Sequence, residues 1–185
     1  INVDFVVINF RSQGIYVMAI NTLKVINPND YKDMIDCYIE QPNFGRDFGS
    51  YKVGFMHVFN QNWYKICPRV IMLNDSVFYS KNGLSEFIRD MINSDVEALG
   101  STENFDIDHH LGSFCIAISN SILRNKKFQK YWSNYKLTDV RPKVIKRGEL
   151  YLSRTLKKCV SSPNNFKALY GASRYSEKIM NDKEF

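Results

Sequence analysis

The residues of this chain that are best suited to chemistry lie in two short stretches. The first is a polar, glycine-bearing loop, PNFGRDFGSYKVG, at 42–54, and the second is the end of an apolar run, Leu73-Asn74-Asp75-Ser76. Glycines let a backbone approach a ligand closely, and a carboxylate at a strand end lies over the carboxyl edge of an α/β sheet. Together the two stretches predict a site for a phosphorylated ligand at that edge.

The loop at 42–54 matches neither of the two commonest nucleotide-binding patterns. It lacks the spacing of the dinucleotide GxGxxG fingerprint, and no Gly-Lys-Ser/Thr follows it as in a P-loop. Its polar side chains stand at the entrance to a predicted helix, where backbone N–H groups favour anions. The loop alone is therefore a weak indication, and the elements around it carry more of the argument.

Those elements alternate between apolar strands and amphipathic helices. The predicted strands are 3–10, 14–21, 35–41, 68–75, 96–102 and 111–119, and the predicted helices are 50–63, 84–93, 122–132 and 139–156. This alternation favours an α/β fold with a mostly parallel sheet flanked by helices. We expect one domain at 1–160, followed by a C-terminal loop and short helix at 161–185.

Composition narrows the class of protein. The chain has 185 residues with 44% hydrophobic content, and it opens on Ile1, which leaves open that it is an excerpt of a longer protein or lacks an opening strand. It carries no apolar run of membrane-span length and no signal segment, so we expect a cytoplasmic location. The scattered cysteines suggest neither a zinc site nor a disulfide framework, and we expect reduced, mostly buried thiols. They are Cys37, Cys67, Cys115 and Cys159.

The charge of the chain is unevenly placed. Residues 124–158 hold twelve Lys or Arg against two acids, within a chain of net charge +6. Such a segment suits an anionic partner, which leaves nucleic acid, a phospholipid surface and a sugar diphosphate open beside plain solvated helix faces. Its aromatic residues recur at helical spacing, which makes core packing a simpler account than base stacking.

The order of these features resembles the rhamnan synthesis protein F family. The resemblance covers roughly 4–160 and lies in an N-x-G-R-D-x-G-S-Y-K-x-G loop, a strand ending LNDS, an acidic TEN segment, an HHLGSF strand and a late R-G-E-L-x-L-S helix. The family belongs with bacterial glycosyltransferases that build cell-surface polysaccharides. The layout is also similar to that of inverting glycosyltransferases with the GT-A fold, which is Rossmann-like.

This resemblance implies that a nucleotide-sugar donor binds at the first two stretches. The implied donor-binding residues are Asn43, Gly45, Arg46, Asp47, Ser50, Lys52, Asn74, Asp75 and Ser76. Asp75 is also the implied metal ligand, for a divalent cation such as Mg²⁺ or Mn²⁺. Because LNDS has one acid where the usual motif has two, stabilisation of the diphosphate by basic side chains stays open. Asp75 in an Asx turn, and Arg46 and Asp47 locking the loop, are the structural alternatives.

Inversion requires a carboxylate that takes the proton of the acceptor hydroxyl. Glu149 is the first candidate for this base, although Gly148-Glu149-Leu150 replaces the usual Glu-Asp pair and a surface ion pair is the alternative role. The reserve candidates are Glu103, Asp106 and Asp108. His109 and His110 are expected near the acceptor, with a metal-ligand or structural role open for His110.

The expected reaction is transfer of a sugar to a cell-surface polysaccharide or a lipid-linked glycan acceptor. The basic segment would then help the protein to contact an anionic membrane surface peripherally. Two other classes stay open: a catalytically inactive glycosyltransferase-like scaffold, and a module that binds nucleic acid or an anionic surface. Of the possible partners, nucleic acid is the one that we do not expect.

Overall fold

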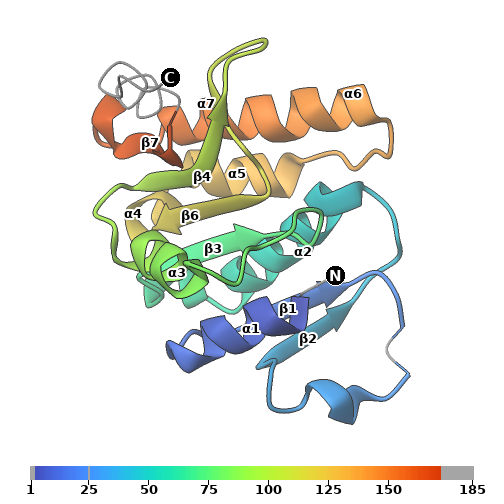
Figure 1. The fold of residues 1–185 in the computed structure, drawn as a ribbon. Coiled ribbons are helices and arrows are strands. Elements are labelled where there is room, and N and C mark those ends of the chain that lie inside the picture. Colours follow the sequence, from blue (N-terminus) through green and yellow to red (C-terminus); the bar gives the residue numbers. More distant parts are fainter. Residues whose placement is uncertain (1–2, 25, 172–185) are drawn as a thin grey trace.

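The computed structural model describes residues 3–24 and 26–171. In this part of the chain two β-sheets are flanked by helices on both faces, with the smaller sheet beside α1 and the larger sheet between α3 and the pair α5 and α7 (Figure 1). The predicted α/β class is therefore confirmed.

The described chain begins with a helix, α1 (Val3–Ser12). We predicted a strand at 3–10 from its β-branched and aromatic residues, and that prediction is wrong. A short apolar run does not distinguish a buried strand from a buried helix. Val6 and Phe10 lie four residues apart, on one face of a helix, and both are buried in a cluster with residues of α3 (Leu84–Asn93). Tertiary packing on that face outweighs the local preference for a strand.

The smaller sheet consists of two parallel strands, β1 (Met18–Asn21) and β2 (Cys37–Glu40), which lie within predicted strands. The connection between them contains a 3₁₀ turn, η1 (Pro28–Tyr31). After β2 the chain forms α2 (Arg46–Asn60), which begins four residues before the predicted start at Ser50. Figure 1 shows α2 running back beneath the sheet, so that the strand after it, β3, runs in the same direction as β2.

The larger sheet has five strands within the described residues. They are β3 (Arg69–Leu73), β4 (Ala98–Asn104), β5 (His110–Leu111), β6 (Cys115–Ser119) and β7 (Phe166–Tyr170). β6 lies between β3 and β4 and is antiparallel to both, β5 is antiparallel to β4, and β7 is parallel to β4. The sheet is thus mixed, not mostly parallel as predicted. One reason is that β4 and β5 are joined by a short connection, which makes them antiparallel, and β6 continues in the direction of β5.

The helices of the second half cover one face of this sheet. They and the remaining short helical segments are η2 (Trp63–Lys65), α4 (Asn120–Arg124), α5 (Lys126–Asn134), α6 (Arg141–Val144), η3 (Ile145–Leu150), α7 (Tyr151–Lys157) and η4 (Pro163–Asn165). The predicted helix at 84–93 is confirmed as α3. The helix predicted at 122–132 is two helices, because the side chain of Asn125 accepts a hydrogen bond from the N–H of Lys127 and begins a new one.

Strand β6 shows how the layers are held together. Ile116 and Ile118 belong to a cluster with α2, α5 and α7, whereas Cys115 and Ala117 belong to a cluster with Met91 of α3. Successive side chains of a strand point to opposite faces, so a strand that is apolar at every position is covered on both. The sheet is the middle of three layers.

The C-terminal part of the described chain departs from prediction at one element. We predicted loop from Ser161 onward, but Phe166–Tyr170 is strand β7, with Ala98 opposite Phe166. Phe166 is buried, and β7 completes the side of β4 that β6 does not cover. The short helix predicted near the end of the chain lies outside the described residues.

Candidate active site

The loop before α2 and the end of β3 lie together, as the sequence predicts. The side-chain N–H of Asn74 donates to the carboxylate of Asp47 over 2.8 Å, and the side-chain oxygen of Asn74 accepts from the N–H of Ser76 over 3.2 Å. Asn74 therefore links the first turn of α2 to the carboxyl end of β3, with Asp75 exposed beside it.

A cavity of about 1000 Å³ opens at this edge. Six of the implied donor-binding residues line it: Asn43, Arg46, Asp47, Ser50, Asn74 and Asp75. The rest of its wall is largely apolar and comes from α1, β1, α2 and β3. The polar groups gather at one end of the cavity, by the carboxyl end of β3, which is where open α/β sheets bind ligands.

The pKa of Tyr51 is affected by the carboxylates at this edge. Burial, and then the nearby charges of Asp47 and Asp75 among others, raise its pKa well above the usual value. Asp47 and Asp75 both line the cavity, so a cation or a bound basic group would have to balance their charge before a diphosphate could enter.

The other three implied donor-binding residues are placed differently. The N–H of Gly45 donates to the Asp139 carboxylate over 2.7 Å, so that the segment after α5 holds the loop. Lys52 donates its ammonium hydrogens to the backbone oxygens of Ser133 and Tyr135 at the end of α5. Neither these two nor Ser76 lines the cavity, and their role in donor binding stays a prediction.

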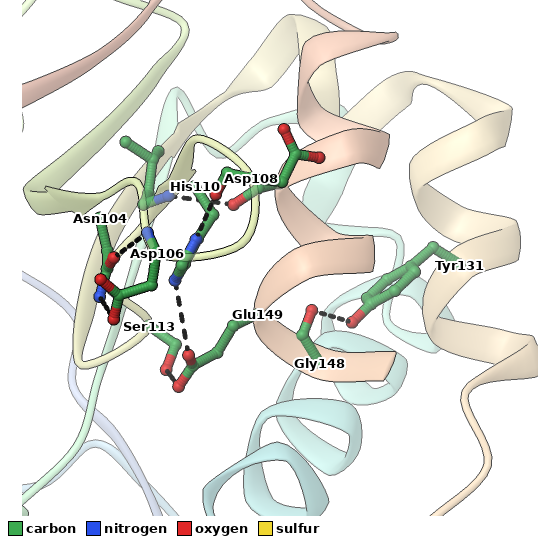
Figure 2. Close-up of polar contacts among 10 residues, drawn as sticks. Asn104, Asp106, Asp108, His110, Ser113, Tyr131, Gly148 and Glu149 are labelled. Carbon is green, nitrogen blue, oxygen red and sulfur yellow. Dashed lines mark hydrogen bonds and ion pairs between the residues drawn. The ribbon is translucent and has the colours of Figure 1, made fainter. Parts of the chain in front are cut away.

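Glu149 lies at the centre of a second polar cluster (Figure 2). The hydroxyl of Ser113 donates to its Oε1 over 2.9 Å, and Nε2 of His110 lies 3.8 Å from its Oε2. Nδ1 of His110 is 2.7 Å from the backbone oxygen of Asp108, and since a carbonyl only accepts, Nδ1 carries the hydrogen there. Buried His110 therefore turns Nε2 toward a carboxylate whose side chain is 30% exposed. A carboxylate that is held on one side and open on the other suits a base.

The backbone at Glu149 is a π-helical turn, η3, between α6 and α7. Gly148 packs against the ring of Phe48, where an added Cβ would lie 2.7–2.8 Å from three ring carbons. The hydroxyl of Tyr131 donates to the backbone oxygens of Arg147 and Gly148, and burial raises its pKa well above the usual value. These contacts hold the widened turn and with it the direction of Glu149. Such turns occur frequently at functional sites.

The two clusters are joined through the segment just before β6. The hydroxyl of Tyr51 donates to the backbone oxygen of Ser113 over 2.9 Å, and the N–H of Asn74 donates to that of Phe114 over 3.0 Å. Ser113, which binds Glu149, is thus one residue from the contact with Asn74. Glu149 itself does not line the cavity but stands next to its polar end.

The reserve carboxylates are engaged elsewhere. Glu103 pairs with His109 at 2.9 Å, and Asp108 pairs with Arg154 at 3.0 Å, a bond that lowers the pKa of Asp108. Asp106 lies in the 104–109 loop, where its N–H donates to the side chain of Asn104 over 2.7 Å. Of the candidate bases, Glu149 alone is joined to Ser113 in the described structure.

Sequence reasoning missed Ser113 and Tyr51 as members of the site. Both lie inside motifs that were noticed, HHLGSF and the 42–54 loop. A serine and a tyrosine carry no distinctive signal, however, and only the tertiary contacts show their roles. The signal that was present is that Tyr51 lies between Ser50 and Lys52, and that Ser113 lies in the same motif as His109 and His110.

Other predicted features bear on what the site holds. In the part of the chain that the structure describes, no three His, Cys, Asp or Glu side chains gather as a metal cluster, and Asp75 as a metal ligand stays a prediction. The cysteines are free; Cys115 is buried and the other three are partly exposed. In the basic segment, Phe128 and Trp132 are fully buried, which confirms core packing for them. No described helix has both the length and the apolarity to cross a membrane.

Comparison with known proteins agrees with these motifs. The sequence model of the family described as rhamnan synthesis protein F matches residues 15–183. An uncharacterized protein, y4gN, from Sinorhizobium fredii is 25% identical over 150 residues, which are 77% of this chain and 38% of the relative. The chain therefore spans about two-fifths of that relative's length. No solved structure matches. Since the family match covers nearly the whole sequence, the chain belongs to the rhamnan synthesis protein F family.

Proposed function

We propose that this chain is a glycosyltransferase domain that moves a sugar from a nucleotide donor to a polysaccharide or lipid-linked glycan. The observation that carries the proposal is the pairing of two clusters at one sheet edge: a cavity with Asp47, Asn74 and Asp75 at its mouth, and a held carboxylate, Glu149, beside it. Membership of the family supports a role in polysaccharide biosynthesis. The proposal includes a GT-A-like fold for this domain, to which further parts of the whole protein would add.

In this mechanism the donor diphosphate lies at the start of α2, near Arg46 and the first N–H groups of the helix. The leaving group gains negative charge as the glycosidic bond breaks, so that stabilising this charge is the main electrostatic task. Asp75 would hold a divalent cation, Mg²⁺ or Mn²⁺, which would neutralise the diphosphate. Ser50 and Asn43 remain for the sugar or the ribose.

Glu149 acts as the base. The Ser113 hydroxyl fixes one oxygen of its carboxylate, and Nε2 of His110 lies 3.8 Å from the other. The exposed side of the carboxylate receives the proton of the acceptor hydroxyl as that oxygen attacks the anomeric carbon. Inversion follows because the nucleotide leaves from the opposite face. His109, stacked on Phe105, lies in the same loop region and would contact the acceptor. The basic surface of α5 to α7 would meet the membrane that carries a lipid-linked acceptor.

The first experiment is a thermal-shift panel of UDP, GDP, dTDP and CMP, each with and without Mn²⁺. A ligand that binds only the folded state at a hundred times its Kd adds about 2.7 kcal/mol of stability. We expect one nucleotide to raise the melting midpoint in a Mn²⁺-dependent way, and Asp75→Asn to abolish the shift. Asp90→Asn, which changes an exposed carboxylate on α3, is the matched control. A panel with no shift from any nucleotide would sink the donor site.

The second experiment measures sugar transfer by the full-length protein. Glu149→Gln should lower kcat by roughly 10²–10⁴-fold while the nucleotide shift is kept, because only the base is removed. Glu86→Gln on α3 is the matched control. If Glu103→Gln or Asp108→Asn abolishes transfer and Glu149→Gln does not, the base is misassigned. Nucleotide binding without any turnover in the full-length protein would point to the inactive scaffold.

A further inference from the structure

The large cavity continues beyond its polar mouth as an apolar groove between the two sheets. One wall is β1 and the other is β3, while residues of α1 and α2 close the two faces. Protein interiors are packed like organic crystals and rarely leave apolar space of about 1000 Å³. The largely apolar lining between β1 and β3 offers few polar partners to a charged donor.

The edge of β3 that faces the groove has free strand-pairing positions. Asn120 donates to Pro68 and Asn74 donates to Phe114, both across the β3–β6 ladder. Backbone groups alternate in direction along a strand, so even-numbered residues of β3 point toward β6. Arg69, Ile71 and Leu73 point their N–H and C=O groups the other way. Within the described residues, β6 is the one strand that pairs with β3.

The edge of β1 shows the same pattern. The backbone oxygens of Val17 and Asn21 accept from Cys37 and Gln41, so the odd-numbered residues of β1 bond to β2. Met18 and Ile20 therefore turn their backbone groups toward the groove. In the described part of the chain β1 pairs with β2 alone. The oxygen of Arg69 accepts from the Cys67 thiol over 2.9 Å, and among the described residues no strand pairs with the other groups of these two edges. Two such edges along one apolar groove are the setting that a single added strand satisfies.

We propose that one further β-strand of the same polypeptide, the stretch that leads into α1, fills this groove parallel to β1 and β3 and joins the two sheets into one. The handedness of the connections selects this stretch. The connection from β2 through α2 to β3 crosses the groove on the face that α2 covers. A connection from a strand in the groove through α1 to β1 would move across the sheet in the opposite direction and on the opposite face. Reversing both the direction and the face keeps the handedness, so the two connections would have the same hand.

Two observations support this occupant. Val6 and Phe10 of α1 already lie over the groove and pack with Ile71 and Leu73 of β3 as well as with α3, so α1 is seated as the helix of such a unit. The Sinorhizobium fredii relative has more than half its length outside the matched region, so that relative contains additional chain. The inference rests on backbone pairing and not on the proposed activity.

Hydrogen–deuterium exchange at single-residue resolution on the full-length protein tests the proposal. The amides of Arg69, Ile71 and Leu73 should exchange within about tenfold of those of Val70 and Met72, which bond to β6 in any case. Met18 and Ile20 should be protected likewise. If the odd-numbered amides of β3 exchange more than about a hundredfold faster than the even-numbered ones, the groove is open and the proposal fails.

A deletion identifies the occupant. Removing the chain before Val3 from the full-length protein should release the odd-numbered amides of β3 and leave Val70 and Met72 protected. These two amides also report whether the sheet is still folded. Protection that survives the deletion, or that rises with protein concentration, would assign the groove to another segment or to a second copy and overturn the proposal.

Discussion

Strands β1 and β6 have similar apolar sequences, MAIN and CIAIS, but they are covered very differently. Four of the five residues of β6 are buried, whereas all four of β1 are only partly buried. Strand β6 has a partner on each edge and helices on both faces. Within residues 3–24 and 26–171, β1 has one partner, and it faces the groove. The comparison shows that an apolar sequence predicts a strand, whereas the neighbouring strands and helices determine how far that strand is buried and paired.

The largest expected difference between the two regions is in the stability lost when a tryptophan is replaced by alanine. Trp132 is fully buried and stacks on Phe55, with ring centroids 4.7 Å apart, whereas Trp63 is half-buried at the groove against Tyr16. Trp132→Ala should lower the free energy of unfolding by about 3–5 kcal/mol, and Trp63→Ala by less than about 2 kcal/mol. Urea denaturation of the 185-residue chain measures both.

The same pair sharpens the comparison in the full-length protein. If a strand covers Trp63 there, the cost of Trp63→Ala should rise toward that of Trp132→Ala. Equal costs of Trp63→Ala in the short and full-length chains would instead mean that the environment of this side chain does not change.

Two glycines give an intermediate contrast. A Cβ at Gly148 would meet the ring of Phe48 at 2.7 Å, while one at Gly54 would meet the end of Ile20 at the same distance. The ring is held in the core, but the tip of Ile20 can turn into the groove. Gly148→Ala should cost about 1–3 kcal/mol, and Gly54→Ala should range from neutral to a gain of about 1 kcal/mol from helix propensity. Thermal denaturation of both variants decides this, and a loss at Gly54 matching that at Gly148 would contradict the contrast.

The smallest effect concerns pH and is confined to the packed region. Burial raises the pKa of Tyr135 to about 12. Between pH 10 and 12 the unfolded chain loses this proton while the folded chain keeps it, so stability falls as pH rises. The hydroxyl of Tyr135 has no hydrogen-bond partner among the described residues, so Tyr135→Phe should leave stability at pH 7 unchanged or improve it.

Melting midpoints from pH 8 to 11 measure the effect on the full chain. Tyr135→Phe should flatten the alkaline fall, and Tyr151→Phe, which changes an exposed tyrosine on α7, is the matched control. Parallel curves for the two variants would mean that Tyr135 ionises normally in the folded state.

The sequence predicted the strands and helices whose periodicity is unambiguous. Residues 84–93 are a helix because Leu84, Ile88 and Met91 recur at helical spacing, and they are buried as that spacing requires. The order of motifs also placed Asp47 and Asn74 at one edge, since a loop and a strand end that flank one crossover meet there.

The remaining elements depended on neighbours that the sequence does not name. Val3–Ser12 reads as a strand but forms a helix, because its apolar residues suit either state and the packing on α3 decides. Phe166–Tyr170 reads as loop but pairs with β4, and a strand of five residues carries too little pattern to be recognised alone. The position of Glu149 could be guessed from the order of motifs, but its contact with Ser113 depends on a π turn that no propensity indicates.

That turn has a consequence for how the family could diverge. A π turn holds about one residue more than an α turn, so a member shortened by one residue between 145 and 150 would have a regular helix there. Its backbone hydrogen bonds would improve, and the helix on either side could keep its faces, because the π turn is what accommodates the extra residue. The side chains inside the turn, Glu149 among them, would be redirected. A single-residue gap in an alignment at this place would therefore mark a relative whose acidic side chain points elsewhere, even where the letters around it are unchanged.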